Sequence, residues 1–446
     1  MQASRWFAFA LVAAPVAAQS AELALELGPR QLARAHSQHE LVRDGDTLFV
    51  AGEVTLHAFD ADTLAPRWSA GPPPGWDPLA ADALAALLRG LALERTWTAP
   101  AVSGETVVAA WLLGKPRTSE QHQLGSILIQ GSVPDRRLFG FDRATGVVCW
   151  SHAPRSDAPK QPRSFAEAMT LLTPPLALDG RIVVACTSDT SSIDYWLAAY
   201  DARGGALLWK TFVLRGQIAR GALGFQMRDH PTPPLVAGPD GTSVLALTGL
   251  GALACVELES GLVRWSSPYP AVPLARTHQY GPIPTPGRWF PTAPRLVGDV
   301  ILAAPPDSRA LCAFDAHDGA LLWDLGEADQ LALFGRLPNQ DELVGADGEH
   351  IALSGRELGL VRVRGGLRAP LGFELVWSRP VEEPLWTRTR WQGDLLYLPV
   401  PGGLVPHDLA TGEPRPVLAL DAELGYRIDA GAVTGLGRRG LTRVAR

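Results

Sequence analysis

A short segment that recurs through the chain constrains the fold more than any other feature. It reads "LFGFDRATGVVCW" at residues 138–150 and returns as "LAAYDARGGALLW", "LACVELESGLVRW", "LCAFDAHDGALLW" and "LHAFDADTLAPRW". In each copy an acidic residue precedes a tryptophan by eight positions, and in four copies a glycine follows the acid by four. An acid that accepts bonds from a turn, followed by a glycine that can take the left-handed conformation, is typical of a β-hairpin. The repeated residues are Asp60, Trp68, Asp142, Gly146, Trp150, Asp201, Gly205, Trp209, Glu257, Gly261, Trp265, Asp315, Gly319 and Trp323.

Two further strands are predicted before each hairpin. The segments "TAPAVSGETVVAAWLL", "TPPLALDGRIVVACTS", "TPPLVAGPDGTSVLALTG" and "TAPRLVGDVILAAPPD" each open on a proline and bend at a glycine. Each unit therefore has four strands, and the tryptophans at 150, 209, 265 and 323 recur at intervals of 56 to 59 residues. Four-stranded antiparallel units at such a period, without intervening helices, favour a β-propeller.

The AxDxxxGxxxW pattern resembles the tryptophan-docking repeat of pyrroloquinoline-quinone propellers. That family includes the quinoprotein alcohol dehydrogenases and the outer-membrane assembly scaffold, and the resemblance covers most of residues 39–446. It implies eight blades. A sixth unit ends at Trp377 after a longer turn, and a seventh keeps Asp408 and Gly412 but has Pro416 in place of the tryptophan.

The last blade needs a strand from the other end of the chain. The tail "YRIDAGAVTGLGRRGLTRV" supplies three strand-like pieces, and "AELALELG" at residues 21–28 could supply the fourth. Closing the ring in this way removes the exposed sheet edges. We therefore expect an all-β, eight-bladed β-propeller of four-stranded antiparallel blades, with seven blades as the alternative.

The first residues are typical of a secretory signal peptide. Residues 1–18 contain Arg5, an apolar run from Trp6 to Ala18, and small residues near a cleavage point. The first cysteine is Cys149, so lipid attachment after the run is not expected, and no other apolar run is long enough to span a membrane. We expect residues 19–446 to form a single, secreted or periplasmic domain and a monomer. A net charge of −6 gives no basic footprint for nucleic acid.

Four cysteines lie in apolar, strand-like segments without CxxC spacing. They are Cys149, Cys186, Cys255 and Cys312. Small buried side chains are the favoured interpretation for all four. Disulfide pairing in an oxidising compartment is the alternative.

Long insertions interrupt the repeat at five places, which are residues 71–97, 112–135, 152–172, 213–231 and 268–291. Residues 77–95 are rich in alanine and leucine and predict a helix. In a propeller all five insertions fall on one face, and loops on a rigid scaffold often bind ligands. The candidate binding residues are Arg228, His230, Arg276, His278, Tyr280, Arg288 and Trp289. The alternative is that these loops plug the central channel or cap blade edges.

Motifs for catalysis are sparse. The segment "HSQHE" at residues 36–40 could offer two imidazoles and a carboxylate to a metal, but it lacks a helix and is interpreted as a solvated loop. The quinoprotein dehydrogenases that the chain resembles use a vicinal disulfide, a calcium ion and a catalytic aspartate. No two cysteines are adjacent, and the acidic ligands cannot be mapped. We therefore expect a non-catalytic binding or scaffold protein for a protein or polymer partner, without a cofactor. The alternative is an oxidoreductase that uses pyrroloquinoline quinone and Ca²⁺ in a degenerate site.

Overall fold

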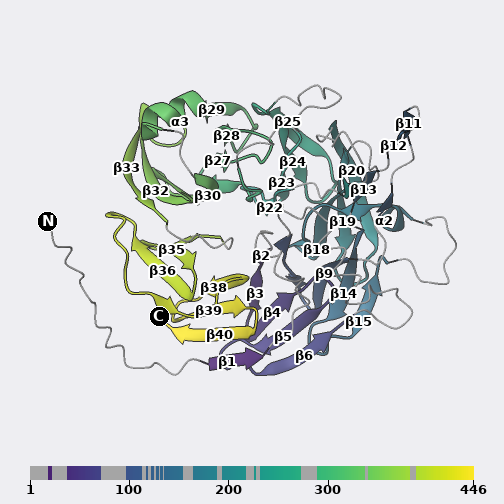
Figure 1. Cartoon of the computed structure of the whole chain (residues 1–446). Helices are drawn as coiled ribbons and strands as arrows, with labels where there is room; N and C mark the ends of the chain where they lie inside the picture. The colour runs from purple at the N-terminus through teal and green to yellow at the C-terminus, as the bar shows by residue number, and fades with distance from the viewer. Residues whose placement is uncertain are drawn as a thin grey trace.

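The computed structural model describes most of the chain from residue 19 to the C-terminus. The described residues are 19–22, 38–71, 97–112, 117–118, 122–124, 127–129, 131–133, 135–153, 164–187, 193–216, 226–227, 232–272, 289–336, 340–381 and 388–446. Most of them form eight antiparallel sheets arranged around a common axis (Figure 1), and each sheet contains four strands in order from the centre outward. The eight-bladed propeller is therefore confirmed, and the seven-bladed alternative is wrong.

The blades follow one another along the chain. Blade one contains β3 (Leu41–Asp44), β4 (Thr47–Ala51), β5 (Leu56–Asp60) and β6 (Pro66–Ala70). Blade two contains β8 (Ala101–Ser103), β9 (Thr106–Leu112), β14 (Arg136–Asp142) and β15 (Val148–Ser151). Blade three contains β17 (Leu176–Leu178), β18 (Arg181–Thr187), β19 (Ile193–Asp201) and β20 (Leu207–Gly216), with β16 (Thr170–Leu171) also paired to β18. Blade four contains β22 (Val236–Ala237), β23 (Ser243–Leu247), β24 (Ala252–Glu257) and β25 (Val263–Pro268).

The second half of the ring repeats this order. Blade five contains β26 (Arg295–Val297), β27 (Val300–Ala303), β28 (Leu311–Asp315) and β29 (Leu321–Leu325). Blade six contains β30 (Gln340–Ala346), β31 (His350–Gly355), β32 (Glu357–Arg364) and β33 (Gly372–Pro380). Blade seven contains β34 (Arg390–Gln392), β35 (Leu395–Val400), β36 (Gly403–Asp408) and β37 (Leu418–Ala419). Blade eight contains β38 (Gly425–Ile428), β39 (Ala432–Gly437), β40 (Gly440–Ala445) and β1 (Gln19–Glu22).

The two ends of the chain close the ring in blade eight. Strand β1 is its outermost strand and pairs antiparallel with β40, from Gln19 opposite Arg443 to Glu22 opposite Gly440. The sequence places the closing strand at 21–28, and the structure begins it two residues earlier. Residues 23–28 lie outside the described residues.

Hydrogen bonds from five repeat tryptophans link a blade to the next one along the ring. Trp68 of blade one donates its indole N–H to the Arg143 carbonyl in the hairpin turn of blade two, at 2.9 Å. The same bond joins Trp150 to Ala202, Trp209 to Leu258, Trp323 to Leu367 and Trp377 to Leu409. The acid at the start of each turn holds the turn itself, as where Asp142 Oδ1 accepts from the Thr145 N–H at 2.8 Å. Apolar side chains of neighbouring blades pack between these links, so the core lies between blades.

Small elements accompany the blades. The short strands β2 (Gln38–His39) and β7 (Trp97–Thr98) pair in parallel, and β11 (His122–Leu124) pairs with β12 (Ile127–Ile129). Strands β10 (Arg117–Thr118), β13 (Gly131–Val133) and β21 (Gln226–Met227) form a three-stranded sheet. The described helices are α2 (Phe165–Ala168) and α3 (Glu327–Phe334), and none is long and apolar enough to span a bilayer. The helix expected at 77–95 lies outside the described residues.

The cysteines differ from expectation at one position. Cys186, Cys255 and Cys312 are buried as free thiols, but Cys149 is exposed. Cys149 lies on β15, the outermost strand of blade two, where its side chain points away from the core. Its neighbours in the sequence, Val148 and Trp150, are apolar, but side chains alternate along a strand and theirs point the other way. The prediction that Cys149 is buried was therefore wrong.

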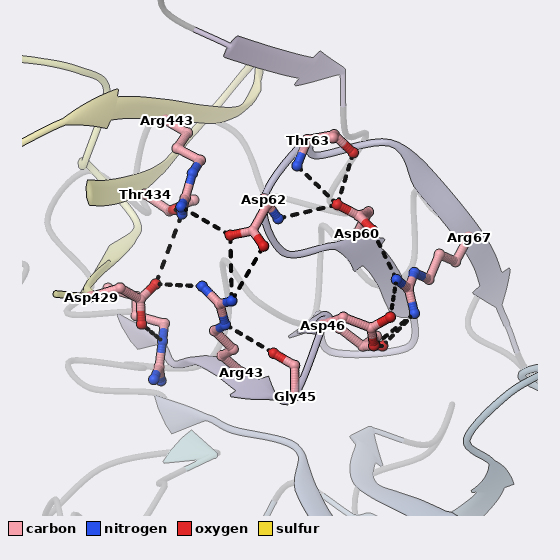
Figure 2. Close-up of polar contacts among 12 residues, drawn as sticks. Arg43, Gly45, Asp46, Asp60, Asp62, Thr63, Arg67, Asp429, Thr434 and Arg443 are labelled. Atoms are coloured by element: carbon pink, nitrogen blue, oxygen red, sulfur yellow. Dashed lines mark hydrogen bonds and ion pairs between the residues drawn. The ribbon is translucent and has the colours of Figure 1, made fainter. Parts of the chain in front are cut away.

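An ionic cluster lies where blade one meets blade eight. Figure 2 shows the Asp62 carboxylate between Arg43 of β3 and Arg443 of β40, with nitrogen–oxygen distances of 3.3 and 3.1 Å. Asp429, which follows β38, lies 3.6 Å from the same Arg43 side chain. The four charges alternate in sign across the junction of the first and last blades.

Replacing Asp62 with alanine is expected to lower the melting temperature slightly. The variant leaves Arg43 and Arg443 close together with one carboxylate fewer, but an exposed ion pair contributes at most about 1 kcal/mol. The decrease should shrink as salt is added. Calorimetry at low and high ionic strength measures it. The control is Glu105→Ala, which removes an exposed acid with no described ion pair, and equal changes in both variants would contradict a role at the junction.

Candidate functional site

A cavity of about 520 Å³ lies on the axis of the ring. Its walls come from the innermost strands of six blades and from the residues that lead into them, which are Glu40, Val42, Arg43, Asp44, Ala99, Pro100, Ala101, Val102, Pro174, Pro175, Leu176, Ala177, Pro234, Leu235, Ala293, Arg295, Arg388, Thr389 and Arg390. A cavity of this volume lies within the range of small-ligand sites.

The cavity has two chemically different sides. Blades two, three and four contribute prolines and aliphatic side chains, such as Pro100, Pro174 and Leu235. Blades five and seven contribute three of the four lining arginines, Arg295 on one and Arg388 and Arg390 on the other, and the fourth, Arg43 of blade one, pairs with Asp62. Ring closure brings these distant segments of sequence together at the axis.

The repeat explains how an arginine reaches this position. Blades two and five enter their inner strands with the same letters, Thr-Ala-Pro, and the next residue is Ala101 in one and Arg295 in the other. Each lies two residues before the last paired residue of its strand, which is Ser103 opposite Thr106 in blade two and Val297 opposite Val300 in blade five. Arg390 has the same place on β34. Because side chains alternate along a strand, residues at this position share the face that lines the cavity.

Arg390 is held in an ion pair. Its Nη2 lies 2.9 Å from Glu40 Oε1, and its guanidinium lies over the ring of Tyr426, 5.4 Å from the centroid. Burial by itself would raise the pKa of Glu40, but the charges of Arg390, Arg388 and Arg295 lower it below the usual value. Glu40 is therefore ionised at neutral pH.

Arg388 and Glu342 are buried side by side without a close bond between them. Arg388 Nε lies 4.0 Å from Glu342 Oε1, and Arg388 Nη2 donates to the Pro291 carbonyl at 2.9 Å. Burial lowers the pKa of Arg388 to about 9 and raises the pKa of Glu342 to about 7. At 4.0 Å the mutual attraction is too weak to offset the loss of water around both groups.

Arg295 has no hydrogen-bond or ion-pair partner among the described residues. Its Nε is buried without an acceptor, and burial lowers the pKa of the guanidinium. The nearest compensating charges are those of Glu342 and Glu40, which act only at a distance. A partly buried cation without a described partner is costly, so this side of the cavity can accept an anion.

The segment "HSQHE" is not a solvated loop at its end. His39 is buried, with Nδ1 2.9 Å from the Ala51 carbonyl oxygen and 2.7 Å from Thr98 Oγ1, and Glu40 reaches the cavity. The pairing of β2 with β7 places His39 beside Thr98 inside the ring. A short polar segment gives no sign in the sequence of such a buried position. His36 lies outside the described residues.

One of the predicted binding residues lies within the described residues. Trp289 is 1% exposed and packs against Val300 and Leu302 of blade five and Ile351 of blade six. Its ring belongs to the core between blades and is not at the surface. The other predicted residues, Arg228, His230, Arg276, His278, Tyr280 and Arg288, lie outside the described residues.

The residues around the cavity do not fit a calcium ion with its quinone. Calcium takes six to eight oxygen ligands. The lining carboxylates are Glu40 and Asp44, and these pair with Arg390 and Arg143. In the described parts of the chain no three His, Cys, Asp or Glu side chains are grouped to hold a metal. The arginines alone could pair with carboxylates of such a quinone.

Comparison with known proteins gives a family and related folds. The family model described as outer membrane protein assembly factor BamB matches residues 19–278. BamB from Moraxella catarrhalis has a TM-score of 0.53 and 13% identity, over 91% of this chain and 93% of that one. A quinohemoprotein alcohol dehydrogenase from Pseudomonas putida has a TM-score of 0.50 and 14% identity, over 96% of this chain and 75% of that one. No curated protein matches the sequence.

Proposed function

This chain belongs to the family described as outer membrane protein assembly factor BamB, whose model matches more than half of it, and on that premise we propose a non-catalytic, extracytoplasmic binding propeller. Its partner is a protein or polymer that engages the face carrying the insertions. The apolar run before residue 19 supports export as part of this proposal.

The position of the insertions relative to the cavity supports this function most. Insertions 71–97, 152–172, 213–231 and 268–291 lead into the inner strands of blades two to five, beside the residues that open the cavity wall. Insertion 112–135 joins the second and third strands of blade two, and alternation of antiparallel strands brings it to the same face. Strands β13 and β21 pair across two of these insertions. The described residues that flank the insertions therefore lie at the same end of the ring as the cavity, which supports the proposal.

The opposite face offers a matched comparison. It carries the tight hairpin turns, in which the carboxylate of the repeat acid holds the backbone, as at Asp60 and Asp408. Val147 is one such turn residue and is 63% exposed. A partner that binds the insertion face should not touch it.

Replacing Arg276, His278 and Tyr280 together with alanine is expected to abolish partner capture. Trp289 is kept because its ring packs the core. A photo-crosslinker at His278 should form an adduct with the partner from an envelope extract, whereas one at Val147 should not. Mass spectrometry of the adducts reads the result. An adduct of the same partner at Val147 alone, or undiminished capture by the triple variant, would contradict the proposed face.

A quinone-dependent oxidoreductase is the second candidate, because the cavity arginines suit a polycarboxylate. Purified protein is incubated with pyrroloquinoline quinone and calcium, and absorbance and dye-linked alcohol oxidation are recorded. We expect no turnover, because the carboxylates beside the cavity are paired with arginines. Stoichiometric uptake with turnover would replace the binding function with the dehydrogenase one.

A further inference from the structure

We propose that the central cavity binds an amphipathic carboxylate, with its charge on Arg295 and its apolar part against the prolines of blades two to four. The carboxylate is that of a small organic acid or of a peptide chain end. The site uses residues of the inner strands and residues that lead directly into them, so it goes beyond the partner surface proposed for the insertions.

The charge of the cavity requires an anion. Arg390 is balanced by Glu40 at 2.9 Å, and Arg388 lies 4.0 Å from Glu342 and donates to the Pro291 carbonyl. Arg295 is left without a described partner, and its Nε is buried. The arginine side of the cavity therefore carries an uncompensated positive charge at Arg295. One carboxylate would balance it.

The shape of the charged groups favours a carboxylate. A guanidinium presents parallel N–H donors that match the two oxygens of a carboxylate, and such bonds are stronger than neutral ones. Arg295 and Arg390 occupy equivalent positions of β26 and β34 and repel each other. An anion between them relieves both the repulsion and the lost hydration.

The opposite wall selects for an apolar body. Pro100, Pro174 and Pro234 stand where the chain enters three successive inner strands, and Leu176 and Leu235 lie beside them. Proline removes the N–H donor from this wall, so it offers little to a polar ligand. Contact with hydrocarbon excludes water from the wall and contributes in proportion to the area covered.

The test is calorimetric titration of the full chain with four probes: phthalate, acetyl-Ala-Ala-Leu, the C-terminal amide of that peptide, and inorganic phosphate. We expect at least one of the two carboxylates to bind, with the amide and phosphate at least tenfold weaker. Binding of phthalate alone identifies a free acid, and binding of the peptide alone identifies a chain end. Binding of neither, or equal binding of phosphate, would overturn the proposal.

The variant Arg295→Met keeps the length of the side chain and removes the charge. We expect at least a tenfold loss of carboxylate affinity with an equal or higher melting temperature, because an unpaired buried charge is lost. Arg295→Lys keeps the charge, and its carboxylate affinity should lie between those of wild type and Arg295→Met. Arg309→Met, between β27 and β28 of blade five, does not line the cavity and pairs with Glu327, so it is the control and should bind like wild type. Unchanged affinity in Arg295→Met, or in Arg295→Lys if the first variant does not fold, would contradict the site. Partner capture on the insertion face is measured separately from carboxylate binding in the cavity. Failure of one proposal can therefore be distinguished from failure of the other.

Discussion

Replacing Trp209 with alanine should lower the free energy of unfolding by about 3 to 5 kcal/mol, the range for a large buried aromatic side chain. The Trp209 side chain is 9% exposed and donates to the Leu258 carbonyl of the next blade at 2.8 Å. It packs with residues of blades three and four, and an aromatic ring of this kind buries about 150 to 250 Å². The substitution therefore leaves a cavity between two blades and one unpaired carbonyl.

Denaturant unfolding followed by circular dichroism measures this loss. The matched control is Leu208→Ala, one residue earlier on β20, where the side chain is 49% exposed and faces away. We expect the control to change stability by less than about 0.5 kcal/mol, as surface substitutions do. An unfolding midpoint for Trp209→Ala equal to that of wild type would contradict the role of the tryptophan between blades.

Replacing Glu342 with glutamine should remove about 3 kcal/mol of pH dependence from the stability of the protein. The pKa of Glu342 is about 7 in the folded protein, because burial outweighs the charge of Arg388, and Asp341 raises it further. In the unfolded chain the ordinary value is 4.5. Between these values the folded protein holds a proton that the unfolded chain has released. The free energy of unfolding therefore falls as pH rises from about 4.5 to 7, and it levels off above.

The gap between the two pKa values sets the magnitude, about 3 kcal/mol lost by pH 8. Denaturation at pH 4 and pH 8 measures the loss in wild type and in Glu342→Gln. We expect the loss of unfolding free energy to be smaller in Glu342→Gln by about 3 kcal/mol, because the amide does not ionise. Glu349→Gln, an exposed acid on the same blade, should keep the wild-type profile. Parallel profiles for wild type and Glu342→Gln would contradict a raised pKa.

The ring could be predicted from the sequence because most blades carry their own copy of the acid, glycine and tryptophan of the hairpin repeat. Asp142, Gly146 and Trp150 set the turn, its left-handed residue and the contact with the neighbouring blade within nine residues. The closing strand could be placed because the tail supplies one strand too few. The outer strand of blade seven is short, and it is there that Pro416 replaces the tryptophan and removes a donor.

The cavity could not be predicted, because it exists only where the ring closes. Glu40 and Arg390 pair at 2.9 Å although 350 residues separate them. A local signal for Arg295 is nevertheless present, since it follows Thr-Ala-Pro where another blade has Ala101. Arg295 and Arg390 are charged at a repeat position where two other blades have Ala101 and Leu176. Trp289 was misplaced for the opposite reason, because an aromatic side chain in an irregular segment looks like a surface anchor until its neighbours are known.

The docking of each repeat tryptophan on the turn of the next blade is the claim on which the ring, and with it the cavity, depends. A double-mutant cycle at Trp209 and Gly261 tests it most directly. Gly261 has φ +74°, and a methyl group added there would lie 2.6 Å from the Trp209 ring. In wild type, Gly261→Ala incurs both the left-handed strain and this overlap, whereas in Trp209→Ala only the strain of about 1 to 2 kcal/mol remains. We predict that the two substitutions are non-additive by at least 1 kcal/mol, within the range for residues in contact. Additive effects would mean that the indole does not lie on the glycine, and would contradict the account.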